Sequence, residues 1–250
     1  KQMKKFLIFW LLCLVGFSQN TESFKQANDL YNSGYYKEAI VRYDSILASN
    51  QHSAELYFNL ANCYYKLNEI GPSIFYYEKA LQLSPNDSDI LNNLGYAQKM
   101  TIDAIQEVPE SGASKLLNKT LNSLSVDGWA TRCVGLAFLF VILFLGYYLS
   151  YSEAKKRLFF VSSCGVLIVL FISLGLLFKK DSLDNNTHPA IVFVKEAGVK
   201  TEPNLRSETS FTLHEGTKVL VIEDYNDDWI KIKLLNGETG WMTRSELKAL

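Results

Sequence analysis

The sequence contains two long apolar runs. They extend from Cys133 to Tyr151 and from Leu158 to Phe178, and neither contains Asp, Glu, Lys, Arg or His. Each is about as long as the roughly 17 to 25 residues that an α-helix needs to cross a bilayer. We therefore predict transmembrane helices over residues 131–151 and 158–178.

The link between the runs, residues 152–157, is polar and contains Lys155, Lys156 and Arg157. Because this link is long enough only for a tight turn, the two helices must be antiparallel neighbours, and the segments on either side of them must face the same compartment. Ionisable groups inside a membrane usually mark an ion path or a substrate site, and the two runs contain none. The pattern therefore favours a passive membrane anchor over a transporter.

The N-terminus has the pattern of an export signal. Lysines at positions 1, 4 and 5 precede an apolar run from Phe6 to Phe17, which is too short to span a bilayer. We predict a signal peptide over residues 1–18. Export then places both soluble segments on the periplasmic side of a bacterial inner (plasma) membrane and makes the 152–157 turn cytoplasmic.

Small and aromatic residues before the first span recur at an offset of 34 residues. Ala27 aligns with Ala61 and Gly95, and Tyr43 aligns with Tyr77. A period of this length, made of paired helices, is typical of tetratricopeptide repeats (TPR), and small residues let the paired helices cross closely. The chain resembles this family over residues 21–100, as two full repeats and the first helix of a third, so we expect an all-α TPR solenoid.

The TPR resemblance implies a peptide-binding groove lined by the first helix of each repeat. The residues at the groove positions are Phe24, Asn28, Tyr31, Phe58, Asn62, Tyr65 and Tyr96. Asn28 and Asn62 match the asparagines with which some members hold a peptide backbone. The basic residues that would bind a terminal carboxylate are replaced by Phe24, Asn92 and Tyr96, so a carboxylate clamp is not expected. The alternative, that both asparagines are ordinary solvated helix residues, remains equally open.

Residues 101–128 connect the repeats to the first span. A break in the helical pattern at residues 108–112 precedes a predicted amphipathic helix from Lys115 to Leu124. Its leucines share one broad face; they are Leu116, Leu117, Leu121 and Leu124. This helix either lies on the membrane surface or caps the repeats, and the sequence leaves both placements open.

A polar linker at residues 181–189 precedes a short β-rich segment. The predicted strands are Ala190–Val194, Thr217–Glu223, Trp229–Leu234 and Glu238–Met242. Asn236-Gly237 is typical of a tight hairpin. Regularly spaced strands in such a short segment predict an all-β small barrel, separate from the TPR module.

The order of residues over 190–250 resembles the bacterial SH3 (SH3b) family. The motifs that carry the resemblance are Glu202-Pro203-Asn204 with Arg206-Ser207, His214 to Val219, Asp228 to Ile232, and Asn236 to Met242. Family members on secreted proteins often bind cell-wall peptides or other proteins. We predict an aromatic recognition face at Tyr225, Trp229 and Trp241; the favoured alternative is that at least one tryptophan packs in the core.

The sequence offers little chemistry for catalysis. His52, His188 and His214 lie in different segments, without cysteine or carboxylate groups at metal-ligand spacing, and Cys63 has no evident histidine partner. The formal net charge of −1, without long charge runs, argues against nucleic acid as a partner. We therefore expect no enzymatic activity, no cofactor and no metal.

The order of export signal, TPR stack, membrane hairpin and SH3b barrel resembles the BatE-like TPR and SH3 members of the Bat family, which is encoded in bacterial aerotolerance operons. This resemblance implies a noncatalytic membrane scaffold, held in the lipid bilayer, with a role in tolerance of oxygen or other stress. Its implied protein partners include the von Willebrand A-domain Bat proteins. The alternative function is a cell-wall tether that binds peptidoglycan peptides through the SH3b domain.

Overall fold

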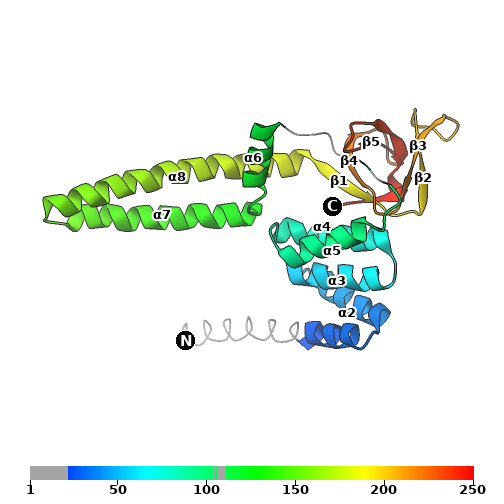
Figure 1. The fold of residues 1–250 in the computed structure, drawn as a ribbon, viewed down its shortest axis with the longest axis horizontal. Helices are drawn as coiled ribbons and strands as arrows, with labels where there is room; N and C mark the ends of the chain where they lie inside the picture. Colours follow the sequence, from blue (N-terminus) through cyan, green and yellow to red (C-terminus); the bar gives the residue numbers. More distant parts are fainter. Residues whose placement is uncertain (1–21, 104, 106–110) are drawn as a thin grey trace, which may run out of the picture. The chain divides into compact units, whose positions relative to one another are not determined.

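The computed structural model describes residues 22–103, 105 and 111–250 (Figure 1). The signal peptide predicted at residues 1–18 lies outside the described residues. The described residues form two compact units. The first unit combines the repeats with the C-terminal barrel, within residues 1–83, 87–107 and 189–250, and the second lies within residues 84–86 and 108–188.

The repeat segment is entirely α-helical between its turns. Its helices cover residues 22–32, α2 (Tyr36–Ala48), α3 (Ala54–Lys66), α4 (Ile70–Leu83) and α5 (Ser88–Gln98). In each of the two full repeats, the turn after the first helix contains a residue with a positive φ angle: Gly34 (82°) and Asn68 (60°). This left-handed conformation reverses the chain at the end of a helix. The helix pairs and their period confirm the predicted TPR fold.

Small side chains let the repeat helices approach closely. Ala27, Ala39 and Ala61 are fully buried. Ser73 in α4 is buried as well, and its hydroxyl donates a 3.0 Å hydrogen bond to the carbonyl oxygen of Ala61 in α3. These contacts explain why the 34-residue pattern of small residues is visible in the sequence.

The C-terminal segment forms a seven-stranded sheet with the order β3-β2-β6-β5-β4-β1-β7. Its strands are β1 (His188–Val192), β2 (Glu196–Lys200), β3 (Thr209–His214), β4 (Lys218–Asp224), β5 (Trp229–Lys233), β6 (Thr239–Thr243) and β7 (Leu247–Ala249). Ile230 in β5 pairs with Met242 in β6 in antiparallel register. Both side chains are fully buried in the barrel core, together with Ile232. The sheet confirms the predicted small barrel of SH3b type.

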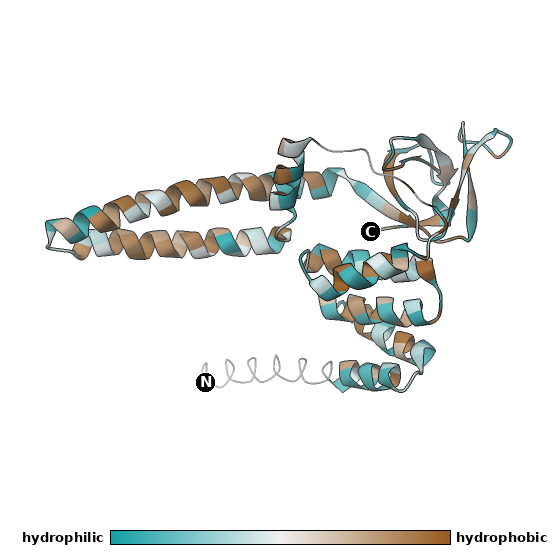
Figure 2. Cartoon of the chain, in the orientation of Figure 1, coloured by the Kyte–Doolittle hydropathy of each residue, from teal (hydrophilic) through white to brown (hydrophobic). Residues whose placement is uncertain are grey.

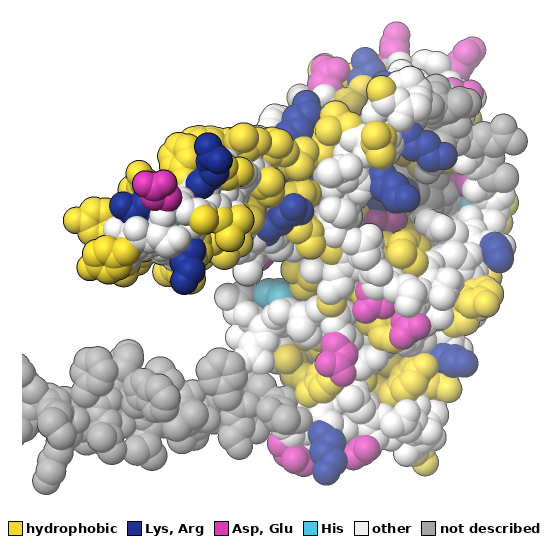
Figure 3. Space-filling view, turned by 60° about the vertical axis from the view of Figure 1, so that its left-hand side comes forward, with side chains coloured by type: hydrophobic (Ala, Val, Ile, Leu, Met, Phe, Trp, Pro, Cys, Tyr) yellow, Lys and Arg dark blue, Asp and Glu magenta, His cyan; other side chains and the backbone are white. Residues whose placement is uncertain are grey.

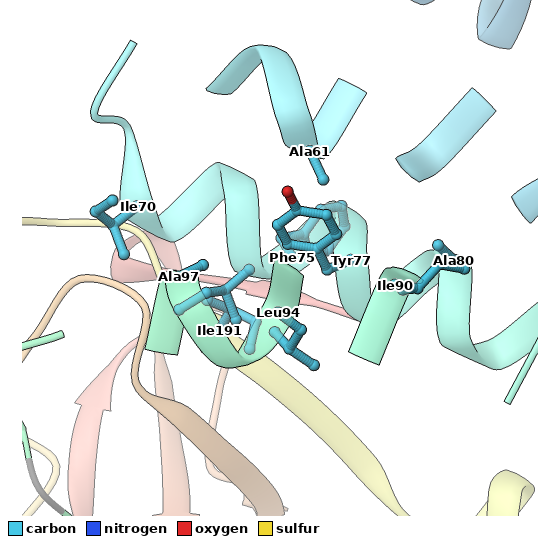
Figure 4. Close-up of a cluster of buried hydrophobic side chains, with 10 residues drawn as sticks. Ala61, Ile70, Phe75, Tyr77, Ala80, Ile90, Leu94, Ala97 and Ile191 are labelled. Carbon is cyan, nitrogen blue, oxygen red and sulfur yellow. The ribbon is translucent and has the colours of Figure 1, made fainter. Parts of the chain in front are cut away.

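Strand β1 contributes side chains to two hydrophobic cores. Successive side chains of a strand point to opposite faces, and Ala190 and Val192 accordingly lie in the barrel core. Ile191 is fully buried in the core formed by α4 and α5, and Phe193 packs against the same cluster. Figure 4 shows Ile191 beside the buried side chains of α5. The repeats and the barrel therefore share a core, which differs from the expectation of two separate soluble modules.

Two glycines permit this close contact between the repeats and the barrel. A Cβ atom on Gly71 in α4 would lie 3.1 Å from the carbonyl oxygen of Val192. Gly216 precedes β4 with a φ of 86°, and a Cβ there would lie 2.9 Å from side-chain carbons of both Ile74 and Thr101. A side chain at either position would push the barrel away from the repeats, and at Gly216 it would also strain the backbone.

Polar contacts add to the shared core. Asp103, in the segment after α5, accepts hydrogen bonds on Oδ2 from the backbone N–H of His214 (2.7 Å) and the hydroxyl of Thr217 (2.5 Å). The Nδ1 atom of His214 lies 2.7 Å from Oδ1 of Asp103. Burial acts to raise the pKa of the Asp103 carboxyl, but these hydrogen bonds outweigh it and hold the pKa below its usual value. Lys218 in β4 also forms a 2.7 Å ion pair with Glu78 in α4.

Two long helices, α7 (Val126–Leu149) and α8 (Glu153–Asn186), form an antiparallel hairpin in the second unit (Figure 1). Both are long and apolar enough to cross a membrane. Their surface is hydrophobic over most of its length (Figure 2), and basic side chains gather at the end where the chain turns (Figure 3). The structure thus confirms the predicted hairpin of two apolar helices.

Small residues lie where the two helices of the hairpin meet. A Cβ atom on Gly146 in α7 would lie 3.1 Å from the ring of Phe159 in α8. Ser150 donates a 2.6 Å hydrogen bond back to the carbonyl oxygen of Gly146, and Ser163 and Ser173 in α8 are buried. Close packing at small residues is typical of helices in membranes.

The helices of the hairpin are longer than the predicted spans. Helix α8 begins at Glu153, so only residues 150–152 separate it from α7, although the sequence suggested a turn at 152–157. It also continues to Asn186, through most of the predicted linker at 181–189. An ion pair of 2.9 Å between Lys180 and Asp184, one helical turn apart, stabilises this extension.

Candidate interaction surfaces

The residues predicted to line the TPR groove all lie on the first helices of the repeats, which we call the first-helix surface. Phe24 and Phe58 occupy equivalent positions in successive repeats. Each is half-buried against a tyrosine of the second helix of its repeat, with ring centroids 5.8 Å apart for Phe24 and Tyr43 and 5.9 Å apart for Phe58 and Tyr77. The phenylalanines thus present only part of their rings to a ligand.

Asn28 and Asn62 belong to a repeated hydrogen-bond network. The Oδ1 atom of Asn62 accepts hydrogen bonds from the hydroxyl of Tyr77 (2.5 Å) and from Nδ2 of Asn93 (3.2 Å). One repeat earlier, Oδ1 of Asn28 accepts the equivalent bonds from the hydroxyl of Tyr43 and from Nδ2 of Asn59. The oxygen of each asparagine therefore links two helices of its own repeat to the next repeat.

This network gives Asn59 and Asn93 roles that the sequence analysis did not assign. The two residues are 34 positions apart, as are Asn28 and Asn62, so the same self-alignment contains the signal. A ligand at this surface would meet the amide nitrogens of Asn28 and Asn62, because the oxygens already accept hydrogen bonds within the protein.

Three tyrosines on the first-helix surface carry hydroxyl groups that can donate and accept hydrogen bonds. Tyr31 is half-buried, and burial, followed by the proximity of Cys63 and Tyr36, raises its pKa. Tyr65 is also half-buried, whereas Tyr96 in α5 is exposed, with Nζ of Lys99 5.4 Å from its ring centroid. Phenyl rings, phenols and amides can bind an extended peptide by stacking and hydrogen bonding, without requiring a charged terminus.

A separate aromatic stack on the repeats was not anticipated from the sequence. The rings of His52, Tyr57, Tyr76 and Tyr64 follow one another with centroids 5.9, 6.1 and 5.5 Å apart. Burial raises the pKa of Tyr76 to about 12. Lys248 of the barrel lies over the Tyr76 ring, with Nζ 5.7 Å from the centroid, and over the neighbouring Phe75, with Nζ 4.6 Å from the centroid. This stack therefore contributes to the contact between repeats and barrel.

The predicted recognition residues of the barrel lie on its outer face. Trp229 alternates along β5 with the core residue Ile230, and Trp241 alternates along β6 with the core residue Met242. Both tryptophans are only 9% exposed, yet neither belongs to the barrel core cluster. Tyr225 is well exposed, and its ring lies edge-on to Trp241 at 5.7 Å. The structure thus brings Tyr225 and Trp241 into contact. Lys231, which follows Trp229 by two residues in β5, covers the Trp241 ring.

Trp229 forms one wall of a cavity of about 440 Å³ on the barrel. The other lining residues are Leu205, Asp227, Asp228, Thr243, Arg244 and Ser245. They come from the loop between β2 and β3, the β4–β5 loop, the end of β6 and the short 3-10 helix η1 (Arg244–Glu246). Of these residues, only Trp229 is predicted from the sequence as a binding residue, because the others meet it only through the fold of the barrel.

The cavity has an acidic side. The guanidinium of Arg244 donates hydrogen bonds to Oδ1 of Asp224 (2.6 Å) and to the backbone carbonyl of Asp227 (3.2 Å). Arg244 is therefore directed to Asp224 and not to the carboxylates of Asp227 and Asp228. An indole wall beside two carboxylates suits a ligand that carries a positive charge on an apolar stem.

Two observations on the described residues bear on metal binding and on thiol chemistry. No group of three or more His, Cys, Asp or Glu residues among the described residues could hold a metal ion. Cys63 is fully buried, and burial raises the pKa of its thiol to about 12, so it stays protonated at neutral pH. Among the sites that the structure describes, the candidates are therefore binding surfaces.

Comparison with known proteins agrees with both folds. Residues 54–87 and 76–107 match models of the tetratricopeptide repeat, and residues 195–248 match the bacterial SH3 domain. TPR and SH3b domains are typically interaction modules without catalytic activity. The chain is also similar to the cell wall-binding protein YwsB of Bacillus subtilis (strain 168), with 36% identity over 53 residues. This match covers 21% of the chain and 30% of the length of YwsB.

Proposed function

We propose that the protein is a noncatalytic scaffold of the bacterial inner membrane that presents its TPR and SH3b modules on the periplasmic side. It acts in a Bat-type complex linked to tolerance of oxygen or other stress. Its partners are other membrane or periplasmic proteins, among them the von Willebrand A-domain Bat proteins. The hairpin of α7 and α8 anchors the scaffold in the bilayer.

The observation that carries this proposal is the core shared by the repeats and the barrel. Modules that pack together through Ile191 and Asp103 must lie in one compartment, although the two apolar helices separate them along the chain. A hairpin that crosses the membrane twice satisfies this requirement. A single crossing would put the modules on opposite sides and break the shared core.

A photo-crosslinking experiment tests the scaffold. A photoreactive amino acid at Tyr96, which is exposed on the first-helix surface, should yield a defined protein adduct in cell membranes. The control position is Val41, which is exposed on the second helix of the first repeat. Recovery of only lipid or wall fragments at Tyr96, or of the same proteins at both positions, contradicts the proposal.

A cell-wall tether is the second candidate function. The similarity to a protein named for cell-wall binding and the acidic cavity beside Trp229 favour it. Peptidoglycan stem peptides can offer the amino group of a diamino acid, which would pair with Asp227 and Asp228. This candidate makes the barrel, and not the first-helix surface, the site that binds the main partner.

Binding of the full-length protein, in detergent, to purified peptidoglycan tests the tether. The double variant Asp227→Asn with Asp228→Asn should bind several-fold more weakly. Glu238→Gln, which removes an exposed charge from the β5–β6 turn, should bind like the unchanged protein. Equal retention of all three proteins, or of none, contradicts a role for this cavity in wall binding.

A further inference from the structure

Helix α6 (Gly112–Leu121) is fixed to the base of the hairpin. It belongs to the same compact unit as α7 and α8. The indole Nε1 of Trp129, in the first turn of α7, donates a 3.1 Å hydrogen bond to the carbonyl oxygen of Leu121. Nζ of Lys180, in α8, lies 3.1 Å from Oδ1 of Asn122, which follows α6 directly. Figure 1 shows α6 crossing α8 instead of running along it.

These contacts lie where the apolar stretches of both long helices give way to charged residues. Arg132 precedes the apolar run of α7, and Lys179 and Lys180 follow that of α8. The guanidinium of Arg132 stacks over the Trp129 ring at 5.1 Å. Tryptophan and basic residues are enriched where a helix meets the headgroup layer of a bilayer. If the hairpin spans the bilayer, a helix attached at this level and crossing it lies at the depth of the headgroup layer.

The side chains of α6 divide into an apolar and a basic face. At 100° per residue, Leu117 and Leu121 share one side, Leu116 extends the apolar arc, and Lys115 and Lys119 lie on the opposite side. Leu121, whose carbonyl oxygen accepts the bond from Trp129, is 1% exposed, whereas Leu116 and Leu117 are 67% and 44% exposed. The helix contains no acidic residue. An apolar face with lysines on the other side complements a bilayer that carries anionic lipids.

We propose that α6 is an interfacial membrane helix, which inserts Leu116 and Leu117 into the boundary between headgroups and acyl chains. Lys115 and Lys119 contact the phosphates of anionic lipids. This inference rests on the proposed function, because it requires that the hairpin spans the bilayer. As an interfacial helix, α6 fixes the depth and tilt of the hairpin in the bilayer. Of the two placements that the sequence left open for this helix, this is the one on the membrane surface.

The test uses full-length protein in vesicles of phosphatidylcholine and phosphatidylglycerol. A fluorescent amino acid replaces one residue at a time: Leu116 or Leu117 on the apolar face, Lys115 or Lys119 on the basic face, and Val141 in the middle of α7. Quenching is measured with lipids brominated at shallow or deep acyl positions, and with acrylamide in the water. Vesicles of phosphatidylcholine alone test the contribution of anionic lipid.

We expect shallow brominated lipid to quench positions 116 and 117 at least several-fold more than positions 115 and 119, and acrylamide to show the reverse order. Deep brominated lipid should quench position 141. Removing phosphatidylglycerol should weaken lipid quenching at 116 and 117. Double substitution Lys115→Gln with Lys119→Gln should have the same effect as removing this lipid.

Two results overturn the interfacial helix while leaving the spanning hairpin intact. In the first, acrylamide quenches 116 and 117 as strongly as 115 and 119, while position 141 remains deep. In the second, neither quencher reaches 116 or 117, which means that protein covers them, either the repeats or a second copy of the chain. Quenching of position 141 by acrylamide and not by lipid instead contradicts the proposed membrane-spanning scaffold.

Discussion

A single substitution on β1 should weaken the repeats and the barrel together. Ile191→Ala removes three carbon atoms from a fully buried site in the shared core. At about 0.8 kcal/mol per buried carbon, this costs about 2.5 kcal/mol. The cavity left between β1 and α5 adds to the loss, and such substitutions in cores cost about 2–5 kcal/mol. A loss of about 2.5 kcal/mol corresponds to a change of roughly 60-fold in the unfolding equilibrium.

Hydrogen–deuterium exchange on the full-length protein in detergent measures this effect. Peptides from α4 and α5 should exchange faster in the Ile191→Ala variant, as should peptides from β4 and β5. The matched control is Ile222→Ala, because Ile222 lies on barrel strand β4 with its side chain exposed. That variant should change stability by no more than about 0.5 kcal/mol. Unchanged exchange in α4 and α5 of the Ile191→Ala variant would refute the shared core.

Three further predictions concern individual contacts. Asp103→Asn should destabilise the soluble unit by about 1–3 kcal/mol at neutral pH. The pKa of Asp103 is lowered in the folded state, so the stability that this carboxylate contributes is present above a pH of about 4 and is lost as the pH falls further. Below that pH, the chemical-denaturation curves of the Asp103→Asn variant should therefore change less than those of the unchanged protein. Tyr77→Phe removes the hydroxyl that bonds to Asn62 and should cost about 0.5–1.5 kcal/mol in the same assay, whereas no change would argue against the asparagine network. Gly146→Leu should lower the free energy of unfolding of the protein in detergent by about 1–3 kcal/mol, because the new side chain meets the packed ring of Phe159. Thermal unfolding measures this change. Gly135→Leu, at a site with open space, is its control, and equal effects of the two substitutions would contradict the described helix contact.

The regular features of this fold could be predicted from the sequence because each is a local pattern. The 34-residue recurrence of small and aromatic residues identifies the repeats, and the two uncharged apolar runs identify the hairpin. Strands β1, β4, β5 and β6 also carry enough β-branched and aromatic residues to be recognised. Strands β2, β3 and β7 were missed because they are short or contain polar and exposed residues.

The contacts between distant segments could not be predicted in the same way. Ile191 is one residue in an apolar strand, and nothing in its neighbours shows that its side chain enters the core of α4 and α5 instead of the barrel core. Asp103 meets its hydrogen-bond partners more than one hundred positions later in the chain. The cavity at Trp229 likewise depends on residues from separated loops, strand ends and the short helix η1. The groove residues lie on the predicted helices, but the hydrogen bonds of Asn28 and Asn62 within the repeats depend on partners in other helices.

The membrane topology of the chain can be measured by labelling single cysteines at three positions. The positions are Glu38 in the repeats, Lys155 near the hairpin turn and Leu205 in the barrel, all of which are exposed. We predict that a membrane-impermeant thiol reagent labels positions 38 and 205 on intact spheroplasts, and labels position 155 only after the membrane is permeabilised. Labelling of position 155 on intact spheroplasts, or labelling of only one of the other two, would contradict a hairpin that leaves both soluble modules outside the cell membrane.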